Sequence, residues 1–77
     1  MKRKVLKVHP GDNVIVALTD LKAGEEITFE GKVFVLKSDV SAKHKFAERR
    51  FETGEEIIMY GVLVGKAQNV IEEGEWI

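Results

Sequence analysis

The sequence contains no cysteine, a single proline and no long apolar run. The lack of cysteine excludes disulfides and thiolate metal sites, which agrees with a reducing compartment. A membrane-spanning helix needs roughly 18 or more consecutive apolar residues, and no segment approaches this length. The first ten residues also lack the apolar stretch of a secretory signal. We therefore expect a cytoplasmic protein without a membrane segment.

A strong excess of one charge is also missing, because the formal net charge is −1 over 77 residues. Domains that bind nucleic acid carry a basic footprint, so we expect no nucleic-acid partner. The length allows one small domain, residues 1–77. Domains of this size often need a partner, or a second copy, for stability.

Short apolar runs of strand length alternate with turn residues, and they cover residues 14–18, 27–29, 33–36, 57–60 and 62–64. The runs on either side of Gly31 predict a β-hairpin with this glycine in the left-handed conformation. Gly61 indicates a tight bend or a bulge between the last two runs. No segment keeps a helical apolar stripe for three turns, so we expect residues 42–51 to be extended and the fold class to be all-β.

One phrase occurs three times, as LKAGEEI at 21–27, FETGEEI at 51–57 and IEEGEWI at 71–77. Its glycine can adopt positive φ at low cost, so each copy predicts a turn that leads into a strand. The apolar first residue is expected to pack on the core. The glutamates that follow the glycines, Glu25, Glu55 and Glu75, are expected to stay in water. A metal site built from them would need the turns to converge, so we interpret the phrase as scaffold.

With its surroundings, this pattern resembles the SAF domain of the altronate/galactarate dehydratase family. The resemblance is carried by DNVIVALTDLKAGEEI at 12–27 and AKHKFAERRFETGEEIIMYGVLVGKAQNVIEEGEWI at 42–77. It implies a β-clip fold, a small all-β architecture of short strands and long hairpins. It also implies the N-terminal domain, or a separate small subunit, of a sugar-acid dehydratase.

Three features depart from the family pattern. The family usually has Pro-x-Gly-His-Lys where residues 41–45 read Ser-Ala-Lys-His-Lys, so Lys43 stands at the glycine position. The family's Asp-Ile in the second turn is Arg50-Phe51 here. The family also tends to continue into a His-rich strand after the last turn. Residues 1–77 do not include that strand, either through trimming or because this member lacks it.

Dehydration of a sugar acid removes the proton α to the carboxylate and expels the β-hydroxyl. A base, an acid and positive charge near the developing dianion are needed. The best candidate stretch is KHKF at 43–46, in which His44 is a candidate catalytic acid or base, metal ligand or substrate contact. The candidate substrate-binding residues are Lys43, Lys45, Arg49, Asp12 and Asn13. In an extended strand His44 would face away from the two lysines, so a shared site requires the loop to bend.

The competing interpretations are structural: a surface position for His44, solvation for the lysines, and turn capping for Asp12 and Asn13. One credible histidine without convergent carboxylates argues against catalysis by this chain alone. We expect it to dock on a larger dehydratase catalytic subunit or domain, close over its active site and attract an anionic sugar acid. No cofactor is expected on this chain alone, and a divalent metal, iron being one candidate, is expected in the catalytic partner. The alternatives are a sugar-acid-binding or regulatory module and the small subunit of a related lyase such as sulfolactate sulfo-lyase. Homo-oligomerisation stays open.

Overall fold

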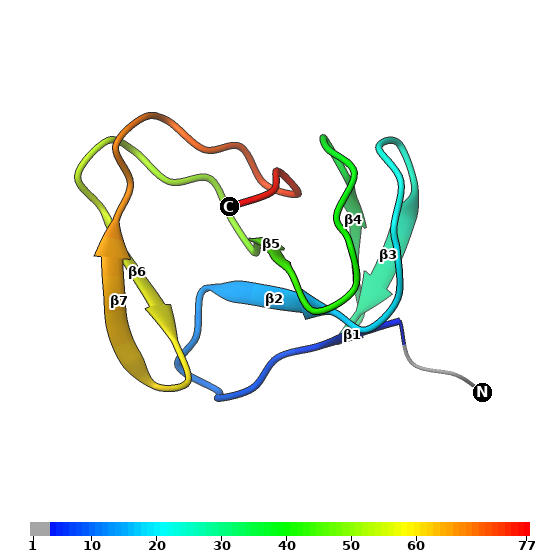
Figure 1. Ribbon diagram of the computed structural model, residues 1–77, viewed down its shortest axis with the longest axis horizontal. Helices are drawn as coiled ribbons and strands as arrows, with labels where there is room; N and C mark the ends of the chain where they lie inside the picture. The colour runs from blue at the N-terminus through cyan, green and yellow to red at the C-terminus, as the bar shows by residue number, and fades with distance from the viewer. Residues whose placement is uncertain (1–3) are drawn as a thin grey trace.

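The computed structural model describes residues 4–77, and every regular element among them is a β-strand. The strands are β1 (Val5–Leu6), β2 (Val14–Ala17), β3 (Glu26–Phe29), β4 (Lys32–Val35), β5 (Lys45–Ala47), β6 (Glu56–Met59) and β7 (Val62–Lys66). The all-β class is therefore confirmed. Figure 1 shows the hairpins β3–β4 and β6–β7 at opposite ends of the molecule, with β2 and β5 between them. None of the described residues belongs to a helix long and apolar enough to cross a membrane.

The central sheet has the strand order β1-β2-β5, and all its pairings are antiparallel. β2 arises from the apolar run predicted at 14–18, although the strand ends at Ala17 and leaves Leu18 exposed. Its residue Ile15 pairs with Phe46 of β5, and both are fully buried. A strand that is covered on both faces reads as a continuous apolar run, which explains why β2 shows no polar alternation.

Residues 21–40 and 51–71 form two copies of one structural unit. The first and last residues of each unit exchange a pair of backbone hydrogen bonds, Leu21 with Val40 and Phe51 with Ile71. The turn glycine of each unit donates its N–H at 2.7 Å to the carbonyl that follows the second strand, Gly24 to Leu36 and Gly54 to Ala67. The repeated phrase therefore marks the start of a repeated hairpin.

Both hairpins end in a two-residue turn with positive φ at both positions, Glu30–Gly31 in the first and Tyr60–Gly61 in the second. This is the type I′ pattern that matches the twist of paired strands. The hairpin predicted around Gly31 is confirmed. Gly61 marks a tight bend. The bulge lies away from the hairpin tip, where the register of β6–β7 shifts between Ile57 and Ile58.

The third copy of the phrase, residues 71–77, has no hairpin of its own and closes on β5 instead. Gly74 donates to the Ala47 carbonyl at 2.9 Å, and Ala47 donates to the Glu75 carbonyl at 3.0 Å. A Cβ at position 74 would lie 2.5 Å from the carbonyl oxygen of Val35, so only glycine fits. The terminal segment thus lies between the two hairpins, as Figure 1 shows.

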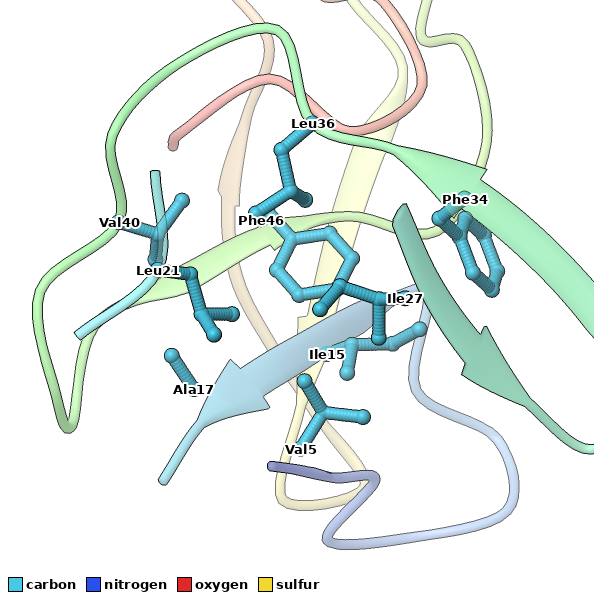
Figure 2. Packing of buried hydrophobic residues seen from close by; sticks show 9 residues of the cluster. All are labelled: Val5, Ile15, Ala17, Leu21, Ile27, Phe34, Leu36, Val40 and Phe46. Carbon is cyan, nitrogen blue, oxygen red and sulfur yellow. The ribbon is translucent and has the colours of Figure 1, made fainter. Parts of the chain in front are cut away.

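The larger hydrophobic cluster gathers around Phe46, whose ring meets that of Phe34 edge to face at 6.0 Å between centroids. Figure 2 shows the side chains of β1, β2 and the first hairpin unit converging on this ring. The cluster consists of Val5, Ile15, Ala17, Leu21, Ile27, Phe34, Leu36, Val40 and Phe46. It joins the first hairpin unit to the central sheet.

A smaller cluster joins the second hairpin unit to the same sheet. Its buried members are Val14, Ala47, Phe51, Ile57 and Ala67. The first residues of the repeated phrase therefore pack on the core as predicted: Leu21 and Phe51 are fully buried and Ile71 is partly buried.

Candidate functional site

The stretch predicted to carry chemistry, residues 43–46, lies where a turn leads into β5. The turn is closed by a hydrogen bond of 3.0 Å from the His44 N–H to the Ser41 carbonyl. The chain forms a strand only from Lys45 to Ala47, so the extended conformation expected over 42–51 is wrong at Lys43, where the chain turns.

Lys43 has a φ of 73°, in the left-handed region that glycine occupies at low cost. Its N–H donates to the Ala17 carbonyl at 2.7 Å. The N–H of the preceding Ala42 donates to the Asp20 carboxylate at 2.9 Å. These bonds hold the turn beside the end of β2 and impose the strained conformation on a lysine. The loop thus bends between the lysine and the histidine.

His44 is exposed, and its imidazole stacks on the indole of Trp76 with 6.2 Å between ring centroids and an interplanar angle of 21°. Trp76 reaches this position because its backbone bridges Phe46 of β5. The backbone N–H of Trp76 also donates to the Ser38 hydroxyl oxygen at 3.4 Å. The contact between His44 and Trp76 was not predicted from the sequence. The two segments are far apart in the chain, and no local pattern signals their meeting.

The two lysines beside His44 carry free positive charge. Lys43 is exposed and Lys45 is half-buried. Across residues 4–77, no ion pair or side-chain hydrogen bond engages either ammonium group. The surface around His44 is therefore suited to an anion.

Asp12 lies under the tip of the β6–β7 hairpin and is only 4% exposed. Its carboxylate accepts N–H groups from Gly61 at 2.9 Å and from Tyr60 and His9 at 3.1 Å each. Burial acts to raise the pKa of Asp12, but these three bonds outweigh it and, with the nearby His9, hold the pKa below its ordinary value. The carboxylate is occupied by backbone, which fits the turn-capping interpretation.

Asn13 has a similar position beside β6. Its side-chain oxygen accepts the Ile58 N–H at 2.9 Å, and its side-chain nitrogen donates to the Glu56 carbonyl at 2.9 Å. Its polar atoms thus tie the start of β2 to the second hairpin.

Arg49 is held by groups of the second turn. Its guanidinium lies 3.0 Å from a Glu55 carboxylate oxygen and 4.7 Å above the centre of the Phe51 ring. It also donates to the Arg50 carbonyl at 2.9 Å. Its charge is therefore partly neutralised at this position.

The predicted site residues fall into two groups at opposite ends of the β2–β5 pair. Val16 pairs with Lys45 at one end, next to His44, and Val14 pairs with Ala47 at the other. Asn13 accepts the Glu48 N–H at that second end, and Arg49 follows there. The structure brings Lys43, His44 and Lys45 together and leaves Asp12, Asn13 and Arg49 at the far end.

The three turn glutamates share a role that the sequence pattern did not indicate. Each carboxylate accepts the backbone N–H three residues earlier, at 3.1 Å for Glu25, 2.6 Å for Glu55 and 2.9 Å for Glu75. They stay partly exposed to solvent, as expected, and in addition they close their own turns. A glutamate whose carboxylate accepts the backbone N–H three residues earlier also occurs in the capping box of helices, where it satisfies an otherwise free N–H group.

These turn bonds also affect the charge state of the glutamates. The Lys22 N–H, followed by the Lys4 ammonium, lowers the pKa of Glu25. The Glu52 N–H, aided by Arg49 and opposed by partial burial, lowers the pKa of Glu55. Both glutamates are thus kept as carboxylates, the form that accepts the bond.

The part of the chain that the structure describes holds no cluster of three or more histidine or acidic side chains able to bind a metal ion. The turn glutamates are engaged by their own backbone, and His44 faces an indole. These residues alone do not fit a metal centre. A metal bound at His44 would need ligands from elsewhere.

Comparison with known proteins identifies the family. The sequence model of the altronate/galactarate dehydratase SAF domain matches residues 3–77. The chain belongs to this family. The resemblance carried by the three turns and the KHKF stretch is therefore confirmed, and the SAF domain accounts for almost all of the chain.

Two curated relatives are altronate dehydratases. The protein from Escherichia coli (strain K12) is 39% identical over 69 residues, which cover 90% of this chain and 14% of that protein. The protein from Bacillus subtilis (strain 168) is 33% identical over 75 residues, which cover 97% of this chain and 15% of that protein. The SAF domain thus corresponds to a small part of much longer relatives.

Proposed function

We propose that this SAF domain is the accessory domain or small subunit of a sugar-acid dehydratase of the altronate/galactarate type. The observation that carries the proposal is the match of residues 3–77 to this family, together with relatives that are altronate dehydratases. Because the chain corresponds to 14–15% of those relatives, the larger remainder is the natural candidate for the catalytic part.

The solvent exposure of His44 supports an assisting role of this domain rather than independent catalysis. Dehydration needs a base, an acid and stabilisation of a dianion in one enclosed place. His44 is exposed beside two free lysines and has no carboxylate partner among the described residues. In the assembled enzyme, His44 would exchange a proton with the substrate or contact it, and Lys43 and Lys45 would attract the sugar-acid carboxylate.

The pairing of residues 76 and 77 with β5 supports a position of the His44 site where this domain meets another part of the enzyme. Phe46 bridges Trp76, and the Ile77 N–H donates to the Lys45 carbonyl at 3.2 Å. Any chain that continued past Ile77 along β5 would run beside His44. The His-rich strand implied by the family resemblance would bring further imidazoles to this place. A divalent metal held there by His44 and that strand would supply Lewis acidity for the α-proton step.

The test replaces the matching 69 residues of the Escherichia coli altronate dehydratase by this chain and measures the 2-keto-3-deoxy product formed from altronate and galactarate. We expect an active chimera, a His44→Ala loss of about 100-fold or more in kcat/KM, and a higher KM for Lys45→Ala. Lys22→Ala, an exposed lysine outside the loop, is the matched control and should keep full activity.

Each outcome has a distinct meaning. A fully active His44→Ala chimera would remove His44 from the mechanism and leave the accessory role intact. A folded chimera without activity on either acid would count against the proposed function. Saturable binding of sugar acid to the isolated 77-residue chain would favour the sugar-acid-binding module instead.

A further inference from the structure

The two hairpins share one backbone plan but present different chemistry to solvent. The tip of the first hairpin is Glu30-Gly31-Lys32, and Lys32 forms an ion pair of 2.8 Å with Glu73 of the third turn. The corresponding tip of the second hairpin is Tyr60-Gly61-Val62, which carries no charge. Since the fold is the same, the difference is not required by the hairpin itself.

The second hairpin exposes an unusual amount of apolar surface. Tyr60 is 61% exposed, Val62 57%, and Leu63 and Val64 52% each. We call these four residues the β7 patch. No charged residue interrupts the chain from Tyr60 to Gly65. Single exposed apolar side chains are ordinary, but a contiguous exposed group of them marks an interaction surface.

β7 is also an edge strand with free hydrogen-bonding groups. It pairs with β6 on one side, and within residues 4–77 no other strand pairs with its second edge. Adjacent strand residues point to opposite faces, so Val62 and Leu63 make both faces of the strand apolar. Proteins normally protect such an edge with charges. β4, the equivalent edge strand of the first hairpin, begins with Lys32, whereas the one charge of β7 comes at Lys66, the last residue of the strand.

We propose that the β7 patch receives an extended apolar segment of the larger dehydratase polypeptide, which adds a strand to the free edge of β7. This inference rests on the proposed function and names the docking surface. The occupant is suggested by the relatives: the chain matches 14–15% of each, so most of each polypeptide lies outside this domain and is available to contact it. An edge that is uncharged from Val62 to Gly65 and apolar on both faces suits an apolar strand, because main-chain bonds give affinity and side chains on both faces are buried.

The test compares backbone amide exchange of β7 in two settings: the isolated 77-residue chain, and chimeras in which this chain replaces the matching segment of the Escherichia coli or the Bacillus subtilis altronate dehydratase. Strand addition protects the amides of the free edge. We expect amides within Val62–Lys66 to exchange at least about tenfold more slowly in a chimera, equivalent to about 1.4 kcal/mol. The tip of the first hairpin should exchange at the same rate in both settings.

Leu63→Lys is the deciding variant, and Val33→Lys is its control. These residues occupy equivalent places in the two hairpins, opposite Ile58 and Thr28, and are 52% and 53% exposed. Both substitutions should leave the isolated chain folded, because neither side chain is in the core. Leu63→Lys should abolish the extra protection of β7 in the chimera, and Val33→Lys should leave it unchanged.

Three results would overturn the proposal. One is equal exchange of β7 in the isolated chain and in folded chimeras of both backgrounds. Another is equal loss of protection in the two lysine variants. The third is concentration-dependent protection of β7 in the isolated chain, with a dimer in sedimentation, which would assign the patch to a second copy. Dehydratase activity is not the readout, so the docking surface and the proposed function can fail separately.

Discussion

The imidazole of His44 lies against the indole of Trp76, with ring centroids 6.2 Å apart. The contact joins the turn before β5 to the third copy of the repeated phrase. It fixes one face of the imidazole and leaves the rest of the side chain exposed. The candidate site is therefore assembled by the packing of the terminal segment on β5.

The fluorescence of Trp76 should report the contact with His44, because Trp76 is the sole tryptophan and its indole lies against the imidazole. Removal of the imidazole uncovers one face of the indole, so His44→Ala should shift the emission maximum to longer wavelength. His9→Ala removes the other histidine and is the control, and it should leave the emission unchanged. An unchanged emission in His44→Ala would show that the rings do not stack in solution.

Replacement of Asp12 should release the tip of the second hairpin. Asp12→Ala leaves three N–H groups without their acceptor, so we expect a loss of about 2–3 kcal/mol in the free energy of unfolding, measured by urea denaturation. Asp39→Ala is the control: this exposed carboxylate accepts a single N–H from Ala23 and should lose less. Equal losses would contradict the capping role of Asp12.

The same carboxylate should make stability depend on pH. Since its pKa is lower in the folded than in the unfolded chain, Asp12 contributes stability that is present above the unfolded value. That contribution is lost as the pH falls below about 4 and through the folded value. Urea midpoints should therefore decrease on acidification, and Asp12→Asn should flatten the decrease. A wild-type slope in Asp12→Asn would rule out this linkage.

Lys43→Gly should stabilise the domain. A non-glycine residue in the left-handed region costs about 1–2 kcal/mol, which glycine would remove. The greater entropy of glycine in the unfolded chain reduces this gain by about 0.5–1 kcal/mol. We expect a net gain of up to about 1 kcal/mol in thermal or urea unfolding. Lys43→Ala keeps the strain and should bring no gain. A loss of stability in Lys43→Gly would reveal a contact of the lysine side chain.

The three turn glycines should respond differently to alanine although all have positive φ. At Gly24 and Gly54 a Cβ meets nothing within 4 Å, so only backbone strain of about 1–2 kcal/mol is expected. At Gly74 the Cβ would also meet the Val35 carbonyl at 2.5 Å. Gly74→Ala should therefore cost about 1–3 kcal/mol more than the other two. Similar urea midpoints for all three variants would show that the terminal turn is not held between the hairpins.

Much of the fold could be predicted from local patterns. The apolar runs around Gly31 predicted a hairpin, Gly61 indicated a tight bend or a bulge, and the repeated glycines predicted turns, because all of these depend on conformational preferences of neighbouring residues. The bend at Lys43 could not be predicted, since it is imposed by hydrogen bonds to distant groups at the end of β2, and no local pattern indicated the position of the bulge in β7.

The candidate site was predicted less completely. His44, Lys43 and Lys45 were found because they are adjacent in sequence. Trp76 was missed as their neighbour because no periodicity relates it to them. Asp12 and Asn13 could be placed in a turn by residue type, but only their bonds to the second hairpin decided where their polar atoms point.

The sequence by itself determined the all-β class, the three turns and the family, because these depend on residue type and spacing along the chain. Tertiary structure decided that two turns open equivalent hairpins while the third closes on β5, and that His44 meets Trp76. It also decided that the uncharged stretch from Val62 to Gly65 lies on a free strand edge. These features depend on contacts between distant segments, whose energies come from packing and hydrogen bonds that only the folded chain brings together.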